Sequence, residues 1–160
     1  MNFSFLKNKY IFVDLDGTLC EYRYYGRVSG KTSDKNSPIV AGHTLSELLF
    51  DTYDAVRPLK TMQNILSQVD PNKLYVLGAC ITFNEVKSKE VWLKKHYPFI
   101  KPENYIFVAD LDIKNEVLKL YSKKLGIKYK DMVFIDDKHA SIRKAEEDGI
   151  PSYHISSFIE

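Results

Sequence analysis

An apolar stretch that ends in two carboxylates constrains the fold of this chain more than any other part of its sequence. The run Ile11–Val13 is made of β-branched and aromatic residues, which predicts a buried strand. Asp14 and Asp16 follow, and a strand covered on both faces ends there because charged side chains are rarely buried. Gly17 permits a tight turn that lets both aspartates face one pocket, and Thr18 can donate a hydroxyl hydrogen bond there. Two carboxylates this close repel unless a proton or a cation lies between them, so the motif predicts a Mg²⁺ site.

The totals of the sequence indicate one domain over residues 1–160. A chain of 160 residues buries about 70% of its unfolded surface when it folds as one unit. The net charge of +2 gives no indication of a nucleic-acid or membrane partner. Cys20 and Cys80 fit no ligand spacing, no leader opens the chain, and no apolar run approaches the ~20 residues of a membrane span. We therefore expect a reduced, cytoplasmic protein, and the sequence leaves its oligomeric state open.

Apolar strands alternate with amphipathic helices along the chain. The expected strands are residues 10–14, 74–77, 105–109, 132–135 and 152–155; the expected helices are residues 44–53, 58–69, 84–97, 114–125 and 141–148. Strands that are apolar throughout and separated by helices predict an α/β fold of three layers. We expect a Rossmann-like, mostly parallel sheet of about five strands, with ligands bound at the carboxyl ends of the strands.

A second pair of acids, Asp136 and Asp137, follows the expected strand 132–135. Taken alone, this pair would favour a cap for the next helix. If the two strands lie side by side, however, four carboxylates meet at one end of the sheet, which costs stability unless a cation compensates it. Asp110 and Asp112 also follow an apolar strand, but they lack a glycine turn, so we expect them to cap the next helix.

Asp14-Leu15-Asp16-Gly17-Thr18 resembles the first motif of the haloacid dehalogenase (HAD) superfamily of phosphatases and phosphotransferases. Ile135-Asp136-Asp137 is similar to its fourth motif, and Lys114, which opens a helix, is similar to its third. The order and spacing of these motifs agree over residues 10–155. The resemblance implies a HAD-like fold with a small cap insertion after the first strand, at residues 20–54.

The resemblance also implies a role for each motif residue. Asp14 would be the nucleophile that forms an aspartyl-phosphate, and Asp16 would be the general acid and then the general base. Mg²⁺ would be bound by the Asp14 carboxylate, the Asp16 backbone carbonyl and Asp137, with Asp136 in support. Lys114 would offset the negative charge of the nucleophile and the phosphate.

The residues expected to bind phosphate depart from the family pattern at one position. Gly17 and Thr18 fit it, but the second motif usually has Ser or Thr after the second strand, and Gly78 stands at the matching position. Thr82 could supply the hydroxyl, or it could be the N-cap of the helix that follows. Gly78 still offers a backbone N–H. If neither this N–H nor the Thr82 hydroxyl makes the missing hydrogen bond, phosphate binding weakens by about 1–3 kcal/mol.

The implied function is a Mg²⁺-dependent phosphatase that hydrolyses a small phosphomonoester. The insertion carries Arg23 and Arg27, which could bind a second anionic group, and several tyrosines that could stack on a base or sugar, so a nucleotide or sugar phosphate is the expected metabolite. One alternative is a non-catalytic relative that binds a phosphorylated ligand or a protein. Another is a HAD-type protein phosphatase, since an open site would admit a peptide.

Overall fold

The computed structural model of the chain describes residues 3–21, 39–40, 43–44, 53, 56–80 and 82–159. Arg23 and Arg27, to which the sequence assigned substrate selection, lie outside the described residues, as does most of the expected insertion at residues 20–54.

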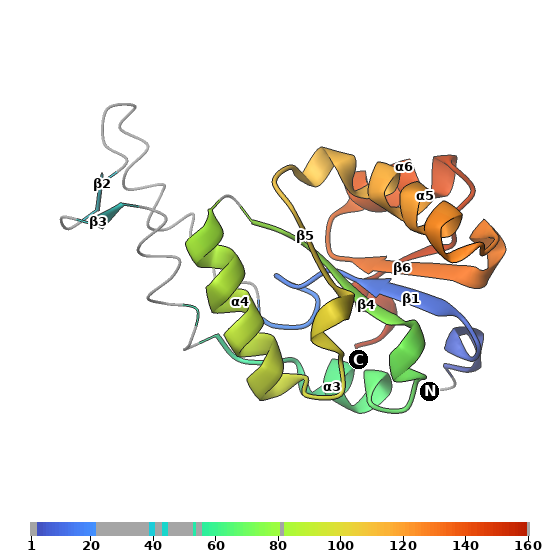
Figure 1. The fold of residues 1–160 in the computed structure, drawn as a ribbon. Coiled ribbons are helices and arrows are strands. Elements are labelled where there is room, and N and C mark those ends of the chain that lie inside the picture. Colours follow the sequence, from blue (N-terminus) through green and yellow to red (C-terminus); the bar gives the residue numbers. More distant parts are fainter. Residues whose placement is uncertain are drawn as a thin grey trace.

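A parallel five-stranded sheet organises the described part of the chain, in the order β5-β4-β1-β6-β7 (Figure 1). Its strands are β1 (Tyr10–Val13), β4 (Leu74–Ala79), β5 (Tyr105–Val108), β6 (Met132–Asp136) and β7 (Ser152–His154). β1 is central, and its last residue, Val13, pairs with Val76 on one side and Ile135 on the other. The predicted α/β fold with a parallel sheet is confirmed.

Helices cover both faces of this sheet (Figure 1). They are α3 (Lys60–Leu66), α4 (Phe83–His96), α5 (Lys114–Leu125) and α6 (His139–Glu147). Short 3₁₀ helices lie at Ser4–Leu6, Pro71–Lys73, Pro102–Asn104, Leu111–Ile113, Tyr129–Asp131 and Ile155–Ser157. No helix in the described ranges is long and apolar enough to cross a membrane.

The alternation of side chains along β1 divides the core into two layers. Ile11 and Val13 belong to a cluster with Met62 of α3 and Trp92 of α4. Phe12 points to the opposite face, in a cluster with residues of α5 and α6. Successive residues of a strand point to opposite faces, so one short apolar run anchors helices on both sides.

Pairing with other segments displaces two predicted helix starts, and a third helix, α6, begins at His139 and not at the expected 141. The helix expected at 58–69 begins at Lys60, because Pro58 forms an isolated antiparallel bridge with Cys20 and Leu59 N donates a hydrogen bond to Leu19 O. Thr44, the expected start of the helix at 44–53, lies instead in β3 (His43–Thr44), which pairs antiparallel with β2 (Ile39–Val40). Cross-strand pairing decides both positions, and a helical period within the sequence does not report it.

The chain order of the strands places the site. From β1 the chain goes to β4 and β5 on one side of the sheet, and it then returns to β6 on the other side of β1. Ligands of such sheets bind at the carboxyl ends of the strands, where the strand order reverses. Here that point lies between β1 and β6, and Asp14 and Asp136 are at the ends of these two strands.

Phe12 tests the packing of the central strand. Its ring is fully buried and stacks on Tyr75 with centroids 4.8 Å apart, so Phe12→Ala should lower the free energy of unfolding by about 3–5 kcal/mol. Urea unfolding at equilibrium measures the change. The matched control is Phe83→Ala, whose side chain is 70% exposed and whose loss should cost no more than about 0.5 kcal/mol. Equal losses for the two variants would contradict this account of the core.

Candidate active site

The turn after β1 presents the first pair of acids. Asp14 N still donates to Ile135 O of β6 at 2.9 Å, and the chain then leaves the sheet. Leu15 O accepts hydrogen bonds from the backbone N–H groups of Thr18 and Leu19, which closes the turn. Gly17 has a φ of 79°, a left-handed conformation that other residues adopt only with strain. The turn that follows Asp16 therefore requires the glycine of the motif.

A buried lysine joins the ends of β1 and β6. Lys114, at the start of α5, is 1% exposed, and its Nζ lies 2.7 Å from Asp14 Oδ1 and 2.8 Å from Asp136 Oδ2. Burial alone would lower the pKa of Lys114, but the carboxylates of Asp14 and Asp136 outweigh it and raise the pKa. Lys114 therefore stays protonated and holds two carboxylates that would otherwise repel each other.

Asp14 combines burial with a strong hydrogen-bond partner. Burial raises the pKa of Asp14 to about 7, and the Lys114 ammonium only partly offsets that effect. Thr18 Oγ1, which is fully buried, donates to Asp14 Oδ2 at 3.3 Å. Asp14 thus has a pKa near neutrality and a fixed orientation, as expected of a functional carboxylate.

Three carboxylates meet closely enough to share a cation. One oxygen each of Asp14, Asp136 and Asp137 lies within 4.8 Å of the other two. Asp136 uses both oxygens within the protein, because Oδ2 contacts Lys114 Nζ and Oδ1 accepts from Lys138 N. Asp137 Oδ1, in contrast, is buried and has no hydrogen-bond partner among the described residues. A buried oxygen without a partner is costly, and a hard cation that prefers oxygen ligands would satisfy it, so the residues fit Mg²⁺.

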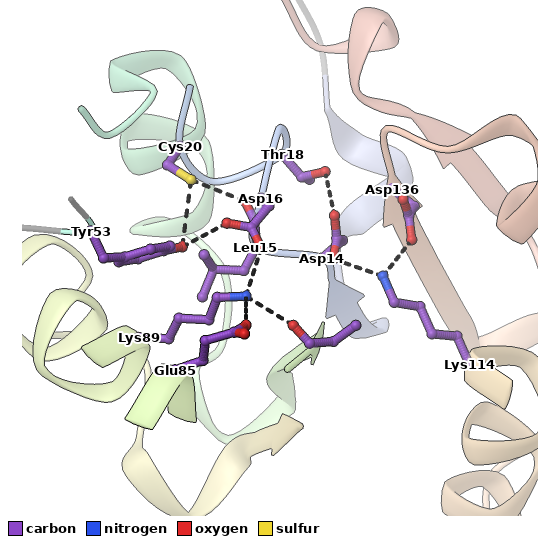
Figure 2. A network of polar contacts seen from close by, with 11 residues as sticks. Asp14, Leu15, Asp16, Thr18, Cys20, Tyr53, Glu85, Lys89, Lys114 and Asp136 are labelled. Atoms are coloured by element: carbon purple, nitrogen blue, oxygen red, sulfur yellow. Dashed lines mark hydrogen bonds and ion pairs between the residues drawn. The ribbon is translucent and has the colours of Figure 1, made fainter. Parts of the chain in front are cut away.

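The carboxylate of Asp16 lies apart from this cluster, so the expectation that both aspartates of the first motif face one pocket and that four carboxylates meet is wrong for Asp16. Two donors on the other side of the turn, Tyr53 and Lys89, hold it there. Figure 2 shows it turned toward Tyr53 and Lys89, while Asp14 faces Lys114 and Asp136. Tyr53 Oη donates to Asp16 Oδ1 at 2.9 Å, and Lys89 Nζ lies 2.7 Å from Asp16 Oδ2. With the side chain engaged in this way, the backbone carbonyl remains the group of Asp16 that is predicted to bind the cation.

Gly78 and Thr82, the other residues expected to bind phosphate, lie near the end of β4 and at the start of α4. Gly78 lies inside β4, where a Cβ atom would contact the Phe107 ring and Leu15 Cβ at 3.5 and 3.6 Å. Thr82 Oγ1 accepts from Glu85 N and is the N-cap of α4, the second of the two roles expected for it. A phosphate contact for Gly78 or Thr82 stays a prediction. Asp110 Oδ1 accepts from Asp112 N and so caps the 3₁₀ helix Leu111–Ile113. The helix α5 itself has no side-chain cap, so the expectation that the rival acidic pair caps it is wrong.

Lys89 and Tyr53 were not among the site residues predicted from the sequence. Lys89 is recognisable in retrospect, because Glu85, Lys89 and Trp92 recur at the spacing of one helix face and all three are buried. A lysine on the apolar face of a helix indicates a buried partner for its charge. Tyr53 carries no such signal, since it lies within the insertion and reaches Asp16 only through the fold.

The geometry can be set against known proteins. No protein-family model matches the sequence, and no curated protein matches it. Among solved structures, one assigned as a phosphoglycolate phosphatase from Lactobacillus plantarum is similar at a TM-score of 0.65 and 16% identity, over 96% of this chain and 90% of the other. A HAD family enzyme from Bacteroides thetaiotaomicron, in complex with magnesium and inorganic phosphate, has a TM-score of 0.55 and 15% identity over 91% and 93% of the two chains. A phosphoserine phosphatase in its apo form has a TM-score of 0.54 and 15% identity over 92% and 86%. At these identities the likeness establishes the HAD fold.

Mg²⁺ binding should strengthen as the pH rises. The pKa of Asp14 is raised to about 7, so the carboxyl mostly holds a proton at pH 6 and must release it before a cation can bind. The Mg²⁺ dissociation constant should therefore be roughly tenfold lower at pH 8 than at pH 6. Isothermal titration in buffers of different ionisation enthalpy would measure both the affinity and the proton released. Equal affinities at the two pH values would contradict the predicted proton release.

Asp137→Asn tests which carboxylate binds the cation. This variant replaces one oxygen of the side chain by an amide nitrogen and should weaken Mg²⁺ binding at least about tenfold. Thermal unfolding with and without Mg²⁺ reports the loss as a smaller rise in melting temperature. Asp110→Asn is the matched control, because an asparagine oxygen can still cap Asp112 N, and it should keep the full Mg²⁺ response. Identical responses of the two variants would exclude Asp137 as a ligand.

Proposed function

We propose that this chain is a Mg²⁺-dependent phosphatase of the HAD superfamily that hydrolyses a small phosphomonoester through an aspartyl-phosphate. One observation carries the proposal: Asp14 contacts a buried ammonium, Lys114, and belongs to an acidic cluster in which Asp137 Oδ1 has no partner among the described residues. A carboxylate attacks an anionic phosphate poorly unless positive charge offsets the repulsion between them. Lys114 supplies one positive charge, and the acidic cluster could hold a second in the form of Mg²⁺.

The reaction proceeds in two steps on the side chains of Asp14 and Asp16. In the first, a carboxylate oxygen of Asp14 attacks phosphorus, the P–O bond to the leaving group breaks, and the leaving oxygen takes a proton from Asp16. In the second, Asp16 accepts a proton from water, which attacks the phosphorus of the aspartyl-phosphate. Phosphate leaves and both carboxyl groups return to their starting states.

Lys114 supports both steps as a fixed positive charge. Its pKa is raised by Asp14 and Asp136 in spite of its burial, so it does not supply the proton for the leaving group. It orients Asp14 and stabilises the charge that spreads over the phosphoryl oxygens in a loose transition state. Asp136 in turn fixes Lys114 from the end of β6.

Mg²⁺ would be held by the carboxylates of Asp14 and Asp137 and the backbone carbonyl of Asp16. When bound, it supplies charge screening between nucleophile and phosphate. Asp136, whose two oxygens are occupied by Lys114 and Lys138 N, supports the site without being a required ligand.

The substrate class is a small phosphorylated metabolite, with a nucleotide or a sugar phosphate favoured. Two proteins with the same fold carry the names of phosphatases for phosphoglycolate and phosphoserine, which are small phosphorylated compounds. The insertion of this chain is short, and Arg23 and Arg27 within it could bind a second anionic group.

Hydrolysis of p-nitrophenyl phosphate tests the proposal. We expect the purified chain to release p-nitrophenol only with Mg²⁺, and Asp14→Asn to lower kcat by more than about a thousandfold because it removes the nucleophile. Asp110→Asn, an exposed aspartate outside the site, should keep its activity within about twofold.

Two results would overturn the proposal. Activity that survives in Asp14→Asn would belong to another residue or to a contaminant. A folded, Mg²⁺-binding chain that hydrolyses neither this compound nor a panel of phosphorylated metabolites would be a non-catalytic binder.

A further inference from the structure

The inner face of α4 delivers a second buried ammonium to the site, on the side of Asp16. Lys89 is 4% exposed, and its Nζ lies 2.7 Å from Asp16 Oδ2 and 2.8 Å from Ala79 O at the end of β4. Glu85, one turn earlier on the same face, approaches Lys89 Nζ at 3.8 Å. These contacts fix the ammonium in one place, between the end of β4 and the turn after β1.

The other oxygen of Asp16 is held by the hydroxyl of Tyr53. Tyr53 is 2% exposed and donates to Asp16 Oδ1 at 2.9 Å. Its ring packs edge-on against Trp92 of α4 at a centroid distance of 5.9 Å, and Lys89 Nζ lies 5.6 Å from the same ring. Trp92 is itself fixed, since its Nε1 donates to Val56 O at 2.9 Å. One helix face therefore supports both donors, because Lys89 lies on it and Trp92 packs against Tyr53. Figure 2 shows the two donors reaching Asp16.

Both donors keep their protons. Burial raises the pKa of Tyr53 well above 10, and the nearby Asp16 charge raises it further. For Lys89, burial acts to lower the pKa, but Asp16 outweighs it and the pKa is raised. Each group reaches Asp16 as a hydrogen-bond donor to one carboxylate oxygen, Tyr53 at 2.9 Å and Lys89 at 2.7 Å, and this geometry assigns it to holding the carboxylate.

We propose that Tyr53 and Lys89 are positioning residues that hold the Asp16 carboxylate, one on each oxygen, in the orientation its acid and base steps require. This assignment rests on the proposed function. A carboxylate has about four lone-pair positions, so two donors leave it able to exchange a proton. Asp16 follows the strand on a turn and its side chain is 36% exposed, so packing alone does not fix its rotamer. A displacement of an acid–base group by about 1 Å can lower the rate on the order of 100-fold. Two donors that fix the Asp16 carboxylate therefore protect the rate.

A double-mutant cycle between Lys89→Met and Asp16→Asn tests the assignment with p-nitrophenyl phosphate and Mg²⁺. Methionine keeps an unbranched side chain and removes the ammonium, so kcat should fall on the order of 10- to 100-fold with KM changed less than about threefold. In the Asp16→Asn background the same substitution should change kcat less than about twofold, because Lys89 acts only through the carboxyl group. Lys87→Met is the matched control, since Lys87 is exposed on the same helix and contacts the Phe83 ring, and it should stay within about twofold of the unaltered chain.

Tyr53→Phe is the second variant, because Lys89→Met leaves Glu85 and Asp16 without their ammonium and could unfold α4. Phenylalanine keeps the ring packed on Trp92 and removes only the hydroxyl. We expect a fall in kcat of about 3- to 10-fold, again absent in the Asp16→Asn background. Thermal unfolding of each variant separates a loss of fold from a loss of rate.

The outcomes distinguish this assignment from the proposed function. If the losses from Lys89→Met or Tyr53→Phe multiply with that of Asp16→Asn, or if KM rises in step with the loss, these residues act on the phosphate or on the fold and are not positioning residues. If the unaltered chain shows no Mg²⁺-dependent hydrolysis, the proposed function fails and this assignment falls with it. A loss confined to kcat and absent without the Asp16 carboxyl supports it.

Discussion

The ammonium of Lys114 is the interaction on which the site depends. It lies in the interior between Asp14 and Asp136, which follow or end the two strands that meet where the strand order reverses. Three buried charged groups are tolerable together only as a set, and removing one member of a buried ion pair typically costs about 3–5 kcal/mol. The same contact that fixes β1 against β6 therefore also fixes Asp14, the residue proposed as the nucleophile. Stability and reactivity are coupled here through one side chain.

The four acidic side chains form two groups, and each group contacts a different lysine. Lys114 belongs to the cluster of Asp14, Asp136 and Asp137, where a cation fits, and Lys89 belongs to Asp16 on the other side of the turn. The division separates the carboxylate proposed to form a covalent bond from the one proposed to move protons. Asp14 and Asp16 therefore have different environments although they are two residues apart in the chain. Paired carboxylates with different environments take different roles in other active sites.

The sequence predicted the parts of the fold that depend on local periodicity. The helix at 114–125 was predicted to the residue, and each predicted strand of the sheet is present within two residues of its expected ends. The four acids at two strand ends were predicted to converge because parallel strands place their carboxyl ends together. Asp14, Asp136 and Asp137 do so, but the carboxylate of Asp16 is held away by Tyr53 and Lys89. Strand pairing could not be predicted from a helical period, either between distant segments, as at Pro58, or in a short hairpin, as at Thr44. The contact of Tyr53 with Asp16 could not be predicted either, because no local period relates the two residues.

The residues that flank the segment 22–55 lie side by side. Glu21 N donates to Arg57 O at 2.9 Å, the Arg57 guanidinium lies 3.0 Å from Glu21 Oε2, and Cys20 bridges Pro58. Because the anchor points already touch, lengthening the segment between them adds little closure entropy, about 0.6 kcal/mol for each doubling. The length and sequence of this segment can therefore change at little cost to the stability of the sheet. The proposed role of Tyr53 adds one requirement, a hydroxyl group that reaches Asp16.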